Sequence, residues 1–272
     1  MIDFNTLELH TDPRGFVTLW LSREQKNNAF NAEMIRELIL ALDAVQSDAS
    51  LRFLLLRGRG RHFSAGADLA WMQQSAELDY NTNLDDARHL AELMYNLAKL
   101  KIPTLAVVQG AAYGGALGLI SACDMAIGAD DAQFCLSEVR IGIAPAVISP
   151  FVVQAIGERA ARRFALTAER FSGERARQLG LLSESYPVAE LEQQVARWTD
   201  TLLLNSPHAM RACKDLLREV SHGAPTPAIR RYCENAIARI RVSPEGQEGL
   251  RAFLQKRTPS WQLDSSRQEP RP

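Results

Sequence analysis

Glu138 is the acidic side chain whose surroundings best suit proton transfer. It stands in the segment CLSEVRIGIAP (135–145), after a short apolar run and before a loop that contains glycine and proline. A carboxyl group beside an apolar cleft gains proton affinity, because burial disfavours its charged form. Such a group can act as a general acid or base. Pairing with Arg140, or exposure to solvent, is the alternative reading of Glu138.

Two glycine-rich segments can present main-chain amides to a ligand. HFSAGADL (62–69) and VQGAAYGGALG (108–118) each follow an apolar run of strand length. Small residues allow close approach to the main chain, and N–H groups at a helix N-terminus stabilise a carbonyl oxygen that becomes an enolate. A tight strand-to-helix turn would look the same, with Asp68 as a helix cap. The glycine spacing of 108–118 does not match the GxGxxG loop of dinucleotide-binding proteins.

The other reactive side chains indicate no second kind of chemistry. His62 and His89 have no serine or cysteine at a spacing typical of nucleophilic catalysis. The four cysteines are far apart and lack a nearby histidine cluster, so no metal site is expected. Trp71 and Met72 would line a ligand pocket or pack in the core. Arg140 would bind a distal carboxylate of a ligand, pair in the neighbourhood of Glu138 or bind a loop carbonyl.

The elements that hold these segments alternate between strand and helix. Predicted strands cover 16–21, 52–58, 104–108, 124–129 and 133–138. Apolar residues at helical spacing predict helices that include 35–45, 84–98 and 115–122, and the pattern from about 188 onward is helical only. This alternation predicts an α/β core followed by a helical extension.

Composition argues against several functional classes. The 272 residues carry 31 Lys and Arg against 32 Asp and Glu, a net charge of -1, so nucleic acid is not an expected partner. The N-terminal residues lack the basic and apolar stretches of a signal peptide. The uncharged stretch 102–123 contains a proline and several glycines, which argue against a membrane-spanning helix. We expect a cytoplasmic protein without membrane contact.

Taken together and in this order, these segments resemble the crotonase (enoyl-CoA hydratase/isomerase) superfamily. The likeness also includes SREQKNNAFN (22–31), CDMAIGADDAQFCLSEVRIGIAP (123–145), ERFSGERARQLGL (169–181) and AFLQKRTP (252–259), and so covers nearly the whole chain. It implies an α/β fold with a crotonase-like ββα spiral core at 1–200, a C-terminal helical trimerisation region at 201–258 and a polar tail at 259–272. The implied assembly is a homotrimer or a dimer of trimers.

The resemblance also assigns roles to individual residues. The N–H groups of Ala67 and Gly115 would form an oxyanion hole for a thioester, with Glu138 as the acid–base residue. The implied substrate-binding residues are Gln25, Lys26, Ala29 and Ala65 around the CoA adenine, together with Asp68, Leu69, Trp71 and Gly114. Lys256, with Arg257, would meet CoA phosphates of a neighbouring subunit or complement the end of its own helix. No metal and no cofactor are implied, since coenzyme A enters as part of the substrate.

One position departs from the pattern of the hydratases in this superfamily. They use two glutamates, and the first would fall at Gly118. The motifs are most similar to those of bacterial hydratases of branched glutaconyl-CoA esters, and small residues such as Ala112, Ala116 and Ala146 favour isohexenylglutaconyl-CoA over 3-methylglutaconyl-CoA. A Δ3,Δ2-enoyl-CoA isomerase that uses a single glutamate is the nearest alternative. A non-catalytic CoA-ester- or RNA-binding protein is the alternative from another class.

Overall fold

The main sheet of the molecule is six-stranded and mostly parallel. A computed structural model describes residues 3–221 and 224–262. The strands, in their spatial order, are β1 (Leu7–Asp12), β2 (Phe16–Leu21), β3 (Leu54–Gly58), β4 (Thr104–Val108), β6 (Met125–Ala129) and β9 (Glu184–Tyr186). Among the described strands of this sheet, only β1 and β2 pair antiparallel. The inner strands β3 and β4 are almost wholly buried, which explains their continuous apolar sequences.

A second, three-stranded sheet lies at the ends of the segments that carry the chemistry. Its strands are β5 (Ala111–Tyr113), β7 (Gln133–Cys135) and β8 (Phe171–Ser172), with β5 parallel to β7 and β7 antiparallel to β8. The glycine turn follows β5 directly, and Glu138 follows β7 by three residues. The pairing of β5 with β7 therefore brings the turn and the carboxyl group together.

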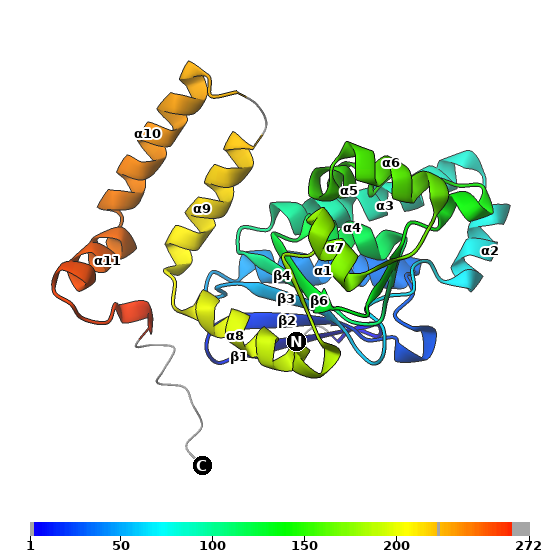
Figure 1. Ribbon diagram of the computed structural model, residues 1–272, viewed down its shortest axis with the longest axis horizontal. Coiled ribbons are helices and arrows are strands. Elements are labelled where there is room, and N and C mark those ends of the chain that lie inside the picture. Colours follow the sequence, from blue (N-terminus) through cyan, green and yellow to red (C-terminus); the bar gives the residue numbers. More distant parts are fainter. Residues whose placement is uncertain (1–2, 222–223, 263–272) are drawn as a thin grey trace, which may run out of the picture.

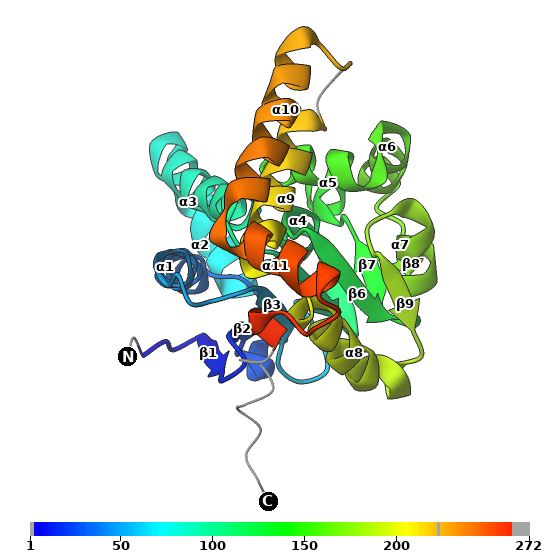
Figure 2. The same cartoon turned by 90° about the vertical axis from the view of Figure 1, so that its left-hand side faces the viewer.

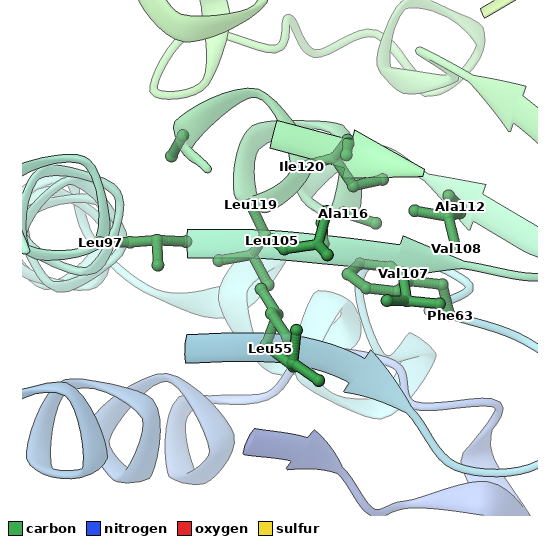
Figure 3. Packing of buried hydrophobic residues seen from close by; sticks show 14 of the residues in the cluster. Leu55, Phe63, Leu97, Leu105, Val107, Val108, Ala112, Ala116, Leu119 and Ile120 are labelled. Atoms are coloured by element: carbon green, nitrogen blue, oxygen red, sulfur yellow. The ribbon is translucent and has the colours of Figure 1, made fainter. Parts of the chain in front are cut away.

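Helices pack around the sheets and complete one hydrophobic core (Figure 1). α1 (Ala32–Ser47) and α3 (Tyr80–Lys99) each bury one apolar side, whereas α4 (Gly115–Ala122) is buried nearly all round. Figure 3 shows Ala112 and Ala116 inside this core, close to Val108 and Leu119. The other helices of this part are α2 (Leu69–Glu77), α5 (Ser149–Ile156), α6 (Glu158–Thr167), α7 (Gly173–Leu179) and α8 (Leu191–Leu203), with 3-10 turns η1 (Glu24–Lys26), η2 (Glu138–Ile141) and η3 (Val188–Glu190).

The last three helices project from the main body and are anchored to it through Arg211 and Lys214, which donate to the Leu51 and Ile102 carbonyls. α9 (Pro207–Val220) and α10 (Pro227–Val242) lie side by side and project from it, with α11 (Pro244–Leu254) near their base (Figures 1 and 2). Each begins with a Ser or Thr cap followed by proline, a pair that fixes a helix start. Neither α9 nor α10 has a buried residue within the described chain.

The sequence patterns located most of these elements. The predicted α/β core and C-terminal helices are present, and 102–123 is divided among β4, β5 and α4 rather than forming one long helix. Among the described residues, no helix is both long and apolar enough to cross a membrane. The strand predicted at 133–138 ends at Cys135, because η2 begins at Glu138. α8 runs through the predicted domain boundary near residue 200, and the boundary stays a prediction. Residues 263–272 of the predicted tail lie outside the described residues.

Candidate active site

The loop that carries Ala67 is attached to the small sheet by main-chain hydrogen bonds. The Ser64 amide donates to the Ala111 carbonyl at 3.0 Å, and the Tyr113 amide donates to the Ser64 carbonyl at 3.0 Å. Gly66 has φ +95°, and a Cβ at that position would lie 3.1 Å from the Tyr113 carbonyl oxygen. Glycine is therefore needed here both for its conformation and for the close approach of the two chains.

Phe30 holds the two predicted donor residues beside each other. Its amide donates to the Gly66 carbonyl at 2.7 Å, and its carbonyl accepts from the Asp68 amide at 2.8 Å. This parallel bridge turns the intervening Ala67 N–H away from Phe30. The ring of Phe30 packs against the other turn, 3.5 Å from where a Cβ on Gly115 would lie. Phe30 thus contacts both loops and, together with the main-chain bonds of Ser64, fixes their relative position.

Both donor amides are available to a ligand. Gly115 is the first residue of α4, so its N–H has no partner inside the helix. Within residues 3–221 and 224–262, neither this amide nor that of Ala67 donates a hydrogen bond. Gly114, with φ +53°, makes the turn and is anchored by its own amide, which donates to the Cys135 carbonyl at 2.9 Å. Two free N–H groups at a helix start and an adjacent loop form a site for a negatively charged oxygen.

The carboxyl group of Glu138 lies directly beside this turn. Its Oε1 is 3.2 Å from where a Cβ on Gly114 would be, so a side chain at that position would press on the carboxyl group. Its Oε2 is buried and has no hydrogen-bond partner in the described chain. Burial raises the pKa of Glu138 above its ordinary value. The geometry therefore combines an oxyanion site with one carboxyl group suited to moving protons.

Polar contacts fix the Ala67 loop to the segment before α1. Asp68 caps α2 by accepting from the Ala70 amide, and it pairs with Arg23 at 3.0 Å. Although burial of Asp68 acts to raise its pKa, these two partners together lower the pKa. The hydroxyl of Ser64 donates to the Asn28 carbonyl at 2.7 Å, and both residues are fully buried. Sequence reasoning missed Arg23, Asn28 and Ser64, although the Asn27-Asn28 pair is a turn signal.

The four residues predicted to border the CoA adenine lie in adjoining loops. Gln25 and Lys26 are exposed in η1, and the Ala29 amide donates to the Lys26 carbonyl at 3.0 Å. The Ala65 amide donates to the carbonyl of Asn27 at 2.9 Å, which places the second loop against the first. Their predicted contact with CoA stays a prediction.

Lys256 lies in the C-terminal region, beyond the end of α11. It has a left-handed backbone with φ +53°, and its amide donates to the Phe253 carbonyl at 3.2 Å. Its neighbour Arg257, also beyond the end of α11, forms an ion pair at 2.6 Å with Glu248 of that helix. No hydrogen bond or ion pair of the described chain joins Lys256 to the loop at 22–31. Its predicted contact with the phosphates of a CoA bound to a neighbouring subunit stays a prediction.

Other candidate residues occupy positions that narrow their roles. Leu69 is 78% exposed at the start of α2, and Trp71 is half-buried against the core. Arg140 donates to the Ala168 carbonyl at 2.6 Å instead of pairing with Glu138. His62 accepts the Ala111 amide at 2.9 Å through Nδ1, which gives it a structural role in fixing the loop.

Two of the small residues that suggested a long acyl tail do not face a ligand space. Ala112 and Ala116 are fully buried in the hydrophobic core (Figure 3). The inference drawn from them was wrong, because their small size serves the packing of β5 and α4. Ala146 alone of the three is exposed, on the loop that follows Glu138.

Comparison with known proteins agrees with this geometry. The family model described as enoyl-CoA hydratase/isomerase matches residues 12–264. The chain belongs to this enoyl-CoA hydratase/isomerase family. A crystal structure of an enoyl-CoA hydratase from Shewanella pealeana is 45% identical, with a TM-score of 0.91 over 95% of this chain and 97% of the other. Pseudomonas aeruginosa AtuE is 37% identical, with a TM-score of 0.90 over 95% and 100% of the two chains.

A further relative is the 2,3-dehydroadipyl-CoA hydratase of Escherichia coli, 30% identical over 244 residues that cover 89% of this chain and 93% of that protein. As a crotonase-fold member of the enoyl-CoA hydratase/isomerase family, this protein is an enzyme of the lyase type that acts on acyl-CoA esters. The predicted fold class and superfamily are thereby confirmed. Within the described residues, no cluster of His, Cys, Asp and Glu side chains could hold a metal ion.

Proposed function

We propose that the enzyme adds water to the α,β double bond of a branched glutaconyl-type acyl-CoA. The Ala67 and Gly115 amides receive the thioester oxygen, and Glu138 activates a water molecule for attack on the β-carbon. The enolate is held by the two amides until the α-carbon is protonated by the same carboxyl group or by a second water. One oxyanion donor contributes about 10²–10³ in rate, so the amide pair is expected to supply most of the stabilisation.

The observation that carries this proposal is the placement of two free amides beside one carboxyl group whose Oε2 atom lacks a partner in the described chain. The Glu138 Oε2 atom has no protein partner in the described chain, and it is buried. A buried carboxyl oxygen without a partner is costly unless a ligand or a water uses it. Hydration makes such use, because the carboxyl group accepts a proton from water in the first step. Coenzyme A enters as part of the substrate, so this reaction needs no separate cofactor.

Two guanidinium groups beside the strand that leads to Glu138 support the glutaconyl class. Burial raises the pKa of Cys135, and the nearby guanidinium groups of Arg140 and Arg170 oppose that rise. Both cations therefore lie close to the strand that leads to Glu138. A distal carboxylate on the acyl group would be attracted to them. The substrate named for the Escherichia coli relative, a dehydroadipyl ester, also carries a second carboxylate.

Of the two esters, isohexenylglutaconyl-CoA is the first choice for assay because Ala146 and its loop are exposed and leave room for a branch. 3-Methylglutaconyl-CoA is the second. The ratio of kcat/KM for the two esters decides between them. Preference for the methyl ester would restrict the proposal to short branches.

Replacement of Glu138 by glutamine tests the role of the carboxyl group. Turnover should fall by about 10²–10⁴, the range for a positioned acid or base, with binding of the CoA ester retained. Because the pKa of Glu138 is raised, wild-type kcat/KM should fall as pH drops through a value above the ordinary glutamate pKa. Glu158→Gln, at an exposed acid of α6, is the matched control. Retained turnover in Glu138→Gln would remove Glu138 from the mechanism.

A Δ3,Δ2-enoyl-CoA isomerase is the second candidate, and Gly118 is the observation that favours it. Moving a proton between the α- and γ-carbons needs one carboxyl group and the same oxyanion site. Incubation with glutaconyl-type and 3-enoyl-CoA esters in ¹⁸O-water separates the two activities. Label in the product identifies hydration, whereas an unlabelled, shifted double bond identifies isomerisation.

A further inference from the structure

Gly118 is packed so tightly that no side chain fits there. It lies one helical turn after Gly115 on α4. A Cβ on Gly118 would stand 2.9 Å from the Cβ of Ile148 and 3.1 Å from the Cε of Met94, with the Ile148 Cγ2 closer still. Distances under 3.0 Å require one of the groups to move. The missing carboxylate at this position therefore leaves no empty space, because apolar side chains fill it.

Ile148 is held in place by the start of α5. It is 3% exposed, and its carbonyl accepts the Phe151 and Val152 amides at 3.1 and 3.0 Å. The loop before it is tied down as well, since the Ile143 amide donates to the Glu138 carbonyl at 3.2 Å. Ile148 thus belongs to the same anchored loop as Glu138. A side chain so placed cannot move aside without disturbing that loop.

We infer that Ile148 is a specificity-determining residue that restricts the site to one carboxyl group by closing the face of α4 next to the oxyanion turn. This inference rests on the proposed function. A glutamate at 118 would have to displace Ile148, and its charge would enter an apolar contact close to a second carboxyl group. With Ile148 present, Gly118 serves packing, and proton transfer on this side of the substrate falls to Glu138 and water.

A thermal-unfolding cycle tests the packing claim without any assay of turnover. Gly118→Ala and Ile148→Ala should each lower the unfolding temperature of the full-length protein. The unfolding temperature of the double variant should fall by less than the sum of the two single decreases, because the smaller side chain at 148 makes room for the new methyl group. Ile156→Ala, at the buried isoleucine that ends α5, is the matched control and should combine additively with Gly118→Ala. Additive losses for Gly118→Ala and Ile148→Ala would overturn the inference.

A second experiment tests the effect on specificity. Gly118→Glu/Ile148→Ala, Gly118→Gln/Ile148→Ala and Ile148→Ala are compared for hydration of crotonyl-CoA, an unbranched ester. The glutamate double variant should hydrate it about 10²-fold faster than the other two, the lower end of what a positioned acid or base contributes. The pH profile of kcat/KM should show two ionisations for the glutamate double variant and one for the glutamine double variant.

The outcomes distinguish this inference from the proposed function. Equal activity of the glutamate and glutamine double variants would overturn the inference, as would a Gly118→Glu single variant as stable as the wild type. If the wild-type enzyme does not hydrate branched glutaconyl-type esters, that result would instead contradict the proposed function. In that case the unfolding cycle still decides whether Ile148 closes the face of α4.

Discussion

The two turns that present the Ala67 and Gly115 amides are held in position by different physical means. The Gly115 turn leads into α4, whose residues are nearly all buried, so hydrophobic packing holds its amide in place. The Ala67 turn leads into α2, which has no fully buried residue in the described chain. There, the Arg23–Asp68 pair and the main-chain bonds of Ser64 supply the rigidity. A main-chain donor can therefore be positioned either by the core or by a polar network.

Among changes at the two turns, removal of the Gly115 N–H should have the largest effect. In Gly115→Pro, kcat/KM should fall by about 10²–10³, because one oxyanion donor is lost while proline is tolerated at the first position of a helix. Gly115→Ala keeps the N–H, and its methyl group would only contact the Phe30 ring at 3.5 Å. Steady-state kinetics with an enoyl-CoA ester measure both variants. Equal losses would mean that steric crowding, and not the missing donor, causes the effect.

Leu117→Ala tests whether packing holds the Gly115 turn. Leu117 is fully buried in α4, so its truncation should lower the free energy of unfolding by about 3 kcal/mol. Urea unfolding should show a lower midpoint with an unchanged slope. A loss below about 1 kcal/mol would show that α4 does not depend on its core contacts to this extent.

Asp68→Asn tests the polar network at the other turn. Asparagine can still cap α2, so the variant removes only the charge facing Arg23, at a cost of about 2 kcal/mol in unfolding free energy at pH 7. Because folding lowers the pKa of Asp68, this stability is present above the ordinary aspartate pKa and is lost as pH falls through the lowered value. Unfolding curves of both proteins should therefore converge on acidification. A difference in unfolding free energy between the two proteins that stays constant with pH would contradict the assignment to charge.

Leu69→Ala should have the smallest effect on stability. Leu69 is 78% exposed on α2, so the free energy of unfolding should change by less than about 0.5 kcal/mol. If this side chain contacts bound substrate, KM should rise about fivefold from the loss of about 1 kcal/mol of apolar contact. A destabilisation as large as that of Leu117→Ala would remove the contrast between the two helices.

The sequence predicted features that depend on local pattern. The apolar runs of β3 and β4, the periodicity of α1 and the glycine turn before α4 all carry their signal within a few residues. The edge strand β1 and the short strand β9 were not predicted, because β1 is partly exposed and β9 has only three residues. Their strand character depends on pairing with distant segments.

The candidate site divides in the same way. Glu138, Ala67 and Gly115 are recognisable from their motifs, and the structure brings them together. The burial of Asn28 and Ser64 is not recognisable, because it arises when segments 36 residues apart in sequence meet. The direction of the Ala112 and Ala116 side chains also depends on how β5 and α4 pack. The sequence alone therefore showed that these residues are small, but not whether their side chains face the core or a bound ligand.

Because both proposed oxyanion donors belong to the polypeptide backbone, most single substitutions at residues 67 and 115 cannot erase them. Proline is the exception among the ordinary amino acids. The proposed acid–base group, the Glu138 side chain, can in contrast be lost through a single substitution. A scaffold of this kind keeps its ability to stabilise an enolate through evolutionary drift while the reaction built on that enolate remains free to diversify.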